Sequence, residues 1–100
     1  ETALALAITE LELPLSRVLA LLSWQPAAIA GLTEAHGGPI VPGAAANLCV
    51  IDPAETWTVD ATALASRSRN TPYAGRTVTG RVRHTVLRGT PTVFEYEAQR

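Results

Sequence analysis

The chain has 100 residues, of which 47% are hydrophobic and 17% are charged, and its formal net charge is −1. These values are typical of a globular protein. The apolar runs of the sequence are too short to span a bilayer, and its single cysteine excludes an internal disulfide. Because the chain contains no methionine, we expect a segment of a longer protein, and the lone cysteine favours a reducing, cytoplasmic location.

The N-terminal third of the chain has the apolar periodicity of helices. Residues 2–12 are predicted to be helical, because Leu4 and Ile8 repeat at a spacing of four and most other positions are also apolar. A helix so apolar is expected to be covered on more than one side. Pro14 is suited to the first turn of a second helix that continues to Leu22.

A short third helix is predicted around Pro26, with Gly31 as a left-handed stop. Ser23, just before it, is interpreted as a capping or packing residue. It is not interpreted as a nucleophile, because no histidine is near it and glycines do not flank it.

After Gly37 the sequence changes to turn signals separated by short apolar runs, which predicts strands. Residues 47–52 are predicted to form a short buried strand that Pro53 ends. Residues 61–66 are expected to form a helical turn that begins at Asp60. Strand signals follow in residues 77–80, 81–89 and 90–95, and the reversal at 88–90 makes the end of the chain a hairpin.

In residues 82–87, strict alternation would place Val82, His84 and Val86 on one side of the strand. Arg83 and Leu87 would lie on the other side, together with Thr85. Arg81 would share the side of Arg83, and we expect this side to be the outer face of a sheet.

None of the side chains that commonly carry chemistry forms a recognisable site. His36 and His84 lack a second ligand at metal spacing, and Cys49 is interpreted as a small core residue. Trp24 and Trp57 are interpreted as anchors of a core or an interface. We therefore assign no catalytic, substrate-binding or metal-ligating residue in this chain.

Charges are segregated along the chain. Residues 1–60 contain seven acids and one base, whereas residues 61–94 contain six arginines and no acid. Four of the arginines lie within residues 66–82. Nucleic-acid binding would require interleaved aromatic side chains, and Tyr73 is the only one between residues 58 and 93. We expect these arginines to join turns to carboxylates of a neighbouring domain.

The order of these motifs closely resembles the C-terminal end of dihydroorotases of the amidohydrolase superfamily. The most specific part of the resemblance consists of Ser66, Ser68, Asn70, Thr71, Pro72, Tyr73, Gly75 and Gly80. Two further runs, residues 42–52 and 80–89, match patterns shared across the wider superfamily. The relatives named hydantoinases and dihydropyrimidinases differ around residues 66–75, so the resemblance favours dihydroorotases.

The resemblance implies an α/β fold that is a fragment of a larger one. Residues 1–37 would be the last helices of a (β/α)8 TIM barrel. Residues 38–100 would be the C-terminal strands of a small β-sandwich domain shared with the protein's N-terminal strands, with a connecting loop at residues 53–76. Glu1 opens a helix and would therefore lie near the mouth of the barrel, where barrel sites form.

The resemblance also implies a zinc-dependent cyclic amidohydrolase that interconverts N-carbamoyl-L-aspartate and dihydroorotate in pyrimidine biosynthesis. The expected zinc ligands, an H-x-H pair among them, have no counterpart in this chain, so the segment alone is expected to be inactive. The implied partners are the upstream part of the protein, a small-molecule substrate, further copies of the chain and aspartate carbamoyltransferase. Neither nucleic acid nor a membrane is expected.

Three other interpretations remain open at this stage. The protein could be another cyclic-amide hydrolase, of the hydantoinase or dihydropyrimidinase kind. It could be a non-catalytic dihydroorotase-like subunit that scaffolds a partner enzyme. Finally, the chain could be an independent basic binding module, which predicts salt-sensitive binding to nucleic acid.

Overall fold

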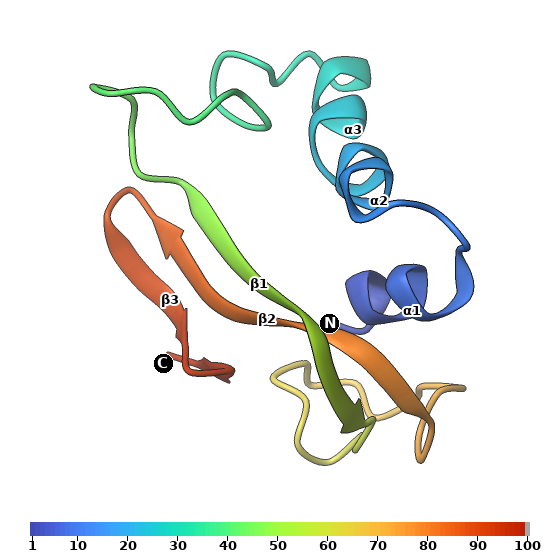
Figure 1. The fold of residues 1–100 in the computed structure, drawn as a ribbon. Helices are drawn as coiled ribbons and strands as arrows, with labels where there is room; N and C mark the ends of the chain where they lie inside the picture. The colour runs from blue at the N-terminus through green and yellow to red at the C-terminus, as the bar shows by residue number, and fades with distance from the viewer. Residues whose placement is uncertain (100) are drawn as a thin grey trace.

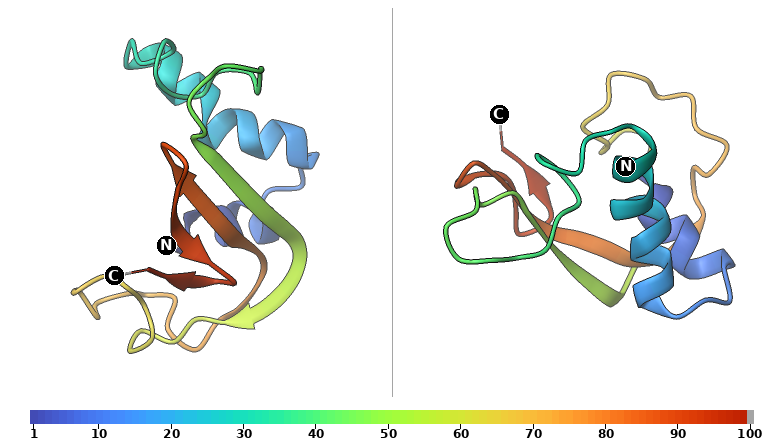
Figure 2. Two further views of the ribbon diagram at one scale, coloured as in Figure 1. Left: turned by 90° about the vertical axis from the view of Figure 1, so that its left-hand side faces the viewer. Right: turned by 90° about the horizontal axis from the view of Figure 1, so that it is seen from above.

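A computed structural model describes residues 1–99. The described chain begins with three helices and continues with one antiparallel sheet whose strands follow chain order (Figure 1). The helices are α1 (Ala3–Glu10), α2 (Leu15–Leu22) and α3 (Trp24–Ile29); the strands are β1 (Leu48–Thr58), β2 (Thr77–Leu87), β3 (Thr90–Phe94) and β4 (Glu97–Ala98). The sheet is strongly twisted, and the helices lie on one side of the long β1–β2 pair (Figure 2).

All three predicted helices are confirmed, with slightly shorter limits. Pro14 separates α1 from α2 and accepts hydrogen bonds from the backbone N–H groups of Arg17 and Val18. Gly31 has φ +69° and ends the short α3, as predicted. Ser23 lies at the N-cap position of α3, but its side chain makes no capping hydrogen bond.

The strand predicted at residues 47–52 is longer and more exposed than expected. Pro53 does not end it, and β1 continues to Thr58. The register with β2 shifts between Asp52 and Thr56, so Pro53 lies in a bulge where its missing N–H breaks no ladder bond. Residues 48–50 are exposed rather than buried. The loop that connects β1 to β2 is therefore residues 59–76, not residues 53–76 as expected. The expected domain division near residue 37 stays a prediction.

Strands β2 and β3 form the predicted hairpin. Leu87 pairs with Thr90, and the two residues between them have φ 50° and 82°, which is the backbone of a type I′ turn. The alternation predicted for residues 82–87 is interrupted, because Val50 pairs with His84 and the next residue of β1 pairs with Val82. Arg83 is thus an extra residue in the β1–β2 ladder.

The buried core of the described residues is small. Its centre is Ala5 of α1, Val78 of β2 and Val59, with Trp57 and Tyr73 packed against it. Long stretches of apolar surface remain exposed over the helices and residues 38–50; Ile29 and Ile40 are the extremes, at 89% and 86% exposed. Apolar surface on this scale is typical of regions that contact other protein. None of the helices in residues 1–99 is long and apolar enough to cross a membrane.

Candidate functional site

The β1–β2 loop, residues 59–76, contacts both ends of helix α1. At the start of the helix, the carboxylate of Glu1 accepts two backbone hydrogen bonds, from Ala65 N to Oε2 at 2.9 Å and from Ser66 N to Oε1 at 2.8 Å. At the other end, Glu10 forms an ion pair with Arg76. Acids of the first part of the chain therefore meet the arginine-rich part, and the loop joins helix to sheet.

The Glu1 carboxyl is electrostatically suited to this position. Its partial burial alone would raise the pKa. The hydrogen bonds from Ala65 and Ser66, together with the charge of Arg69, favour the ionised form and outweigh burial, so the pKa of Glu1 is lowered from its ordinary value of 4.5. The carboxylate is consequently charged at neutral pH and accepts both N–H groups.

Arg69 organises the interior of the β1–β2 loop. Its Nη1 donates to three backbone carbonyl oxygens of the same loop at distances between 2.8 and 3.0 Å; they belong to Ala61, Leu64 and Ser66. A single guanidinium thereby satisfies three acceptors that an irregular loop leaves without ladder partners.

The turn predicted to begin at Asp60 is confirmed, but it covers only residues 61–63 and does not continue as a helical turn to residue 66. The Asp60 carboxylate accepts hydrogen bonds from the hydroxyl and the backbone N–H of Thr62, and Ala63 N donates to Asp60 O at 3.1 Å. The hydrogen bond from the Thr62 hydroxyl, followed by that from its N–H, lowers the pKa of Asp60 despite an opposing effect of burial. Asp60 thus fixes the first turn of the loop.

Between the two ends of α1, the helix is hydrogen-bonded to β2. The backbone N–H of Thr79 donates to Thr9 Oγ1 at 2.9 Å, and the same hydroxyl donates to Ala5 O at 2.7 Å. On the sheet side, Trp57 Nε1 donates to Gly80 O at 3.0 Å. Together with Glu1 and Glu10, these contacts fix both the position of α1 along β2 and its rotation.

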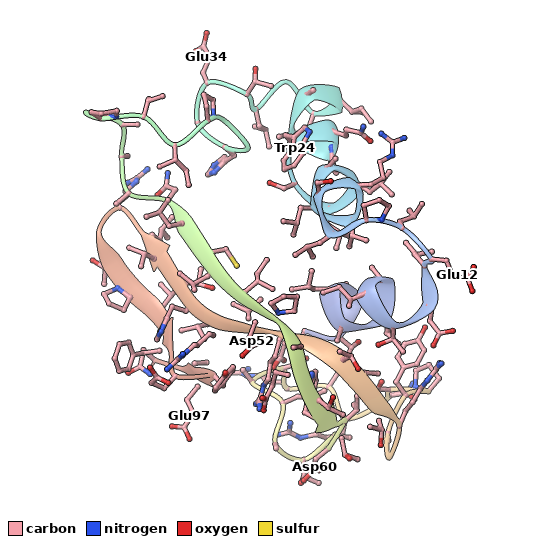
Figure 3. All side chains as sticks on the ribbon, in the orientation of Figure 1. Glu12, Trp24, Glu34, Asp52, Asp60 and Glu97 are labelled. Atoms are coloured by element: carbon pink, nitrogen blue, oxygen red, sulfur yellow. The ribbon has the colours of Figure 1, made fainter. Side chains whose placement is uncertain are left out.

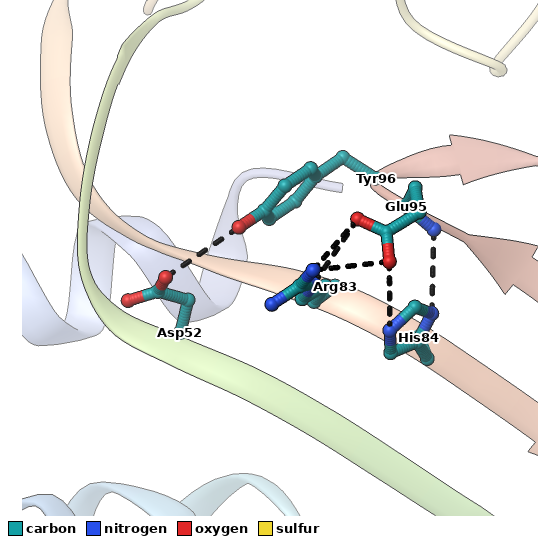
Figure 4. Close-up of polar contacts among 5 residues, drawn as sticks. All are labelled: Asp52, Arg83, His84, Glu95 and Tyr96. Atoms are coloured by element: carbon teal, nitrogen blue, oxygen red, sulfur yellow. Dashed lines mark hydrogen bonds and ion pairs between the residues drawn. The ribbon is translucent and has the colours of Figure 1, made fainter.

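A second group of polar side chains surrounds the turn between β3 and β4 (Figure 4). Arg83 donates to both carboxylate oxygens of Glu95 at 3.0–3.1 Å, and His84 Nε2 lies 3.5 Å from Glu95 Oε1. Glu95 N donates to His84 Nδ1 at 3.3 Å, and Tyr96 OH donates to Asp52 Oδ2 at 3.4 Å. The group connects β1 and β2 to the C-terminal turn.

Arginine side chains stack on the aromatic rings next to this turn. The Cζ atom of Arg81 lies 5.0 Å from the ring centres of both Trp57 and Tyr96, and that of Arg83 lies 5.9 Å from Tyr96. Both arginines therefore reach the ring of Tyr96, and Arg81 lies near two rings. The predicted separation of Arg83 from His84 is not seen, because the irregular register at Arg83 lets both side chains contact Glu95. Glu95 and Tyr96 have φ 45° and 71°, so these contacts hold two non-glycine residues in a left-handed turn.

Most of the other residues considered from sequence play no part in either group. His36 is exposed in the turn after α3, and Trp24, at 45% exposed, is not buried in a core. The side chains lie spread over the whole ribbon, with acids such as Glu12, Glu34 and Glu97 far apart at its periphery (Figure 3). Within residues 1–99 no three His, Cys, Asp or Glu side chains are placed to hold a metal ion together.

The interpretation of Cys49 as a core residue is wrong. Cys49 is exposed, because the helices stand away from this part of β1. It lines an apolar hollow of about 400 Å³ that it shares with Leu4, Leu19, Leu22, Ser23, Ile51 and Val82. Although the residue as a whole is exposed, partial shielding of the thiol from solvent raises its pKa, and a hydrogen bond with Thr85 lowers the pKa in part. The hollow leaves apolar side chains of α2 and β1 uncovered.

Sequence reasoning did not find the partner of Glu1. The segregation of acids and arginines led us to expect contacts between arginines and carboxylates of a neighbouring domain, and the structure pairs Arg76 with Glu10 of α1. The donors to Glu1 are backbone N–H groups, and no residue type at positions 65 and 66 marks such donors in a sequence.

The chain was compared with known proteins. No protein-family model matches it. It is 44% identical to the dihydroorotase of Mycobacterium leprae, over 92% of this chain and 22% of that protein. It is 49% identical to the dihydroorotase of Streptomyces coelicolor, over 74% of this chain and 17% of that protein. It is 40% identical to the dihydroorotase of Mycobacterium tuberculosis, over 92% of this chain and 22% of that protein.

The chain thus spans about a fifth of the length of the curated relatives it matches. The matches cover 74–92% of this chain, at identities well above those that reflect fold alone. They agree with the resemblance found in the motifs of residues 42–52 and 66–89. The chain therefore belongs to the dihydroorotase family and is a C-terminal segment of such a protein.

Proposed function

We propose that this segment, joined to the chain upstream of Glu1, is part of a working dihydroorotase. The enzyme would catalyse the reversible cyclisation of N-carbamoyl-L-aspartate to dihydroorotate in the cytoplasm. The observation that carries the proposal is the 40–49% identity to curated dihydroorotases over 74–92% of this chain. Because the chain spans only about a fifth of the length of these relatives, we propose that the upstream part carries out the reaction itself.

The described residues do not fit a zinc site. Their histidines are far apart in sequence, His84 is engaged with Glu95, and within the described range no cluster of three potential ligands exists. We therefore propose that any metal of the full-length protein is held entirely by upstream residues. The segment's own task is structural: it supplies helices, a sheet and the joint between them.

The exposed apolar surfaces support dependence on the upstream chain. Leu22 and Trp24 are each 45% exposed and Ile29 is 89% exposed, and the hollow beside Cys49 is lined by apolar side chains. We propose that the upstream chain covers these surfaces as the rest of a (β/α)8 barrel and as further strands of a β-sandwich. The segment would then be inactive alone, in keeping with the size of a complete barrel.

The decisive experiment is an assay of the full-length protein. Purified with its upstream sequence and supplied with zinc, it should convert dihydroorotate to N-carbamoyl-L-aspartate and back. Turnover of hydantoins or dihydropyrimidines in place of dihydroorotate would favour another cyclic-amide hydrolase. No turnover, together with stable binding to aspartate carbamoyltransferase, would favour a non-catalytic scaffold. Size-exclusion chromatography of the same sample tests whether the protein is a homo-oligomer.

A further inference from the structure

The contact between Glu1 and the β1–β2 loop has a specific geometry. Each carboxylate oxygen accepts one hydrogen bond, and the two donors are the N–H groups of consecutive residues, Ala65 and Ser66. A carboxylate held by two donors is fixed in orientation as well as in position. Glu1 directly precedes α1, so the contact fixes the point at which the chain enters the helix.

The loop on the other side of this contact is organised independently of Glu1. Arg69 binds three of its carbonyl oxygens, and Asp60 fixes its first turn. The base of the loop is closed by hydrogen bonds from Val59 N to Arg76 O at 2.9 Å and from Gly75 N to Val59 O at 2.8 Å. The two N–H donors are consequently presented by a constrained backbone, which can hold a partner in place.

We propose that Glu1 is a positioning residue of the full-length enzyme. Its carboxylate attaches the segment that leads into α1 to the β1–β2 loop, and so determines where that upstream segment lies. This inference rests on the proposed function. In a barrel enzyme the segment before a helix is the loop that follows a strand, and such loops form the active site.

The requirement for glutamate follows from the donors. Glutamine at this position keeps one carbonyl oxygen but presents an NH₂ group to the second N–H, which leaves two donors facing each other. Aspartate keeps both acceptors but is one methylene shorter, so it cannot reach both N–H groups without a shift of the backbone. A shift of about 1 Å in a segment that positions catalytic groups can reduce the rate by about 10²-fold.

The test compares two variants of the full-length protein, E1Q and E12Q. Glu12 is an exposed glutamate just beyond α1 with no hydrogen bond or ion pair within residues 1–99, so E12Q controls for the loss of one negative charge. We expect E1Q to lower kcat for dihydroorotate by about 10-fold or more with little change in KM. It should also speed amide hydrogen exchange in the peptide containing residues 65 and 66, whereas E12Q should change neither.

The outcomes separate this inference from the proposed function. Wild-type turnover tests the function, and the difference between E1Q and E12Q tests the role of Glu1. An active wild type with E1Q indistinguishable from E12Q in kcat and exchange would overturn the inference and leave the function intact. A wild type without turnover would overturn both. If E1Q does not fold, E1D replaces it, with an intermediate loss of kcat expected and wild-type kcat contradicting the role.

Discussion

Gly80 of β2 lies directly beneath Ile8 of α1. A β-carbon added at Gly80 would come 2.5 Å from Ile8 Cδ1 and 3.4 Å from its Cβ and Cγ1, and the backbone φ of Gly80 is +93°. The positive φ favours glycine at this position, and a β-carbon would force the end of the Ile8 side chain to move. The close approach also explains how α1 can place Thr9 within hydrogen-bonding distance of the β2 backbone.

Replacing Gly80 with alanine should destabilise the protein through both effects. The positive φ costs about 1–2 kcal/mol for a residue with a β-carbon, and movement of the end of the Ile8 side chain adds about 0.5–1.5 kcal/mol. Thermal unfolding of full-length Gly80→Ala measures the sum. Gly75→Ala is the matched control, because Gly75 also has a positive φ, +78°, but open space around it. Equal losses for the two variants would show that packing against Ile8 contributes nothing.

Thr9 is expected to stabilise the joint between α1 and β2 through its hydroxyl. Thr9→Val keeps the shape of the side chain but removes the acceptor of the Thr79 N–H, a loss of about 0.5–1.5 kcal/mol for a hydrogen bond at an exposed site. Thr9→Ser retains the hydroxyl and should lose much less. Urea-unfolding midpoints of the two variants give the comparison, and a valine variant as stable as the serine variant would contradict the role of the hydroxyl.

Tyr96 is expected to act mainly through its ring. Its hydroxyl makes a long hydrogen bond to Asp52, 3.4 Å, whereas its ring faces the guanidinium groups of Arg81 and Arg83. Tyr96→Phe should change the free energy of unfolding by no more than about 0.5 kcal/mol, and Tyr96→Ala should lower it by about 1–2 kcal/mol. The positive φ at position 96 is equally unfavourable for alanine and tyrosine, so it does not contribute to the difference between them. A large loss in Tyr96→Phe would instead point to the hydroxyl.

The elements that follow from local chemistry could be predicted, and those that depend on distant contacts could not. The three helices and the Arg88–Gly89 turn were predicted because Pro14, Gly31 and Gly89 mark their limits. The full length of β1 was not predicted, since a proline such as Pro53 normally ends a strand. Here the carboxylate of Asp52 accepts hydrogen bonds from Ala54 N and Glu55 N and supports a bulge that lets the strand resume.

The candidate site likewise depends on contacts between residues that are far apart in the chain, which could not be predicted from sequence. Its arginines were recognised as groups that join turns to carboxylates, but their partners are separated from them by up to 66 positions in the chain. Cys49 was misplaced because burial was inferred from its apolar neighbours in sequence, Leu48 and Val50, which are themselves 37% and 49% exposed. Local hydrophobicity does not reveal which surface is covered by the rest of a larger protein.

The hairpin turn between β2 and β3 offers a stabilising change. Arg88 has φ 50° and Gly89 has φ 82°, and asparagine is the preferred first residue of such a type I′ turn. The backbone N–H of Arg88 donates to Asn47 Oδ1 at 2.8 Å, an interaction that any residue except proline preserves. A left-handed conformation costs most residues about 1–2 kcal/mol and asparagine less, so Arg88→Asn should raise the free energy of unfolding by up to about 1 kcal/mol, and thermal unfolding measures it. Arg88→Ala is the control and should give no such gain.

The contribution of Glu1 to stability should depend on pH. The pKa of Glu1 is lower in the folded protein than its ordinary value of 4.5, so the unfolded state binds a proton first as the pH falls. The stabilisation is then fully present above about pH 5.5, begins to decline near 4.5, and is lost as the pH falls through the folded-state pKa. Urea midpoints of wild type and E1Q should therefore differ by a constant amount between pH 7 and 5.5 and converge below 4.5. A difference that stays constant down to pH 3.5 would mean that the ionised carboxylate of Glu1 does not hold the β1–β2 loop.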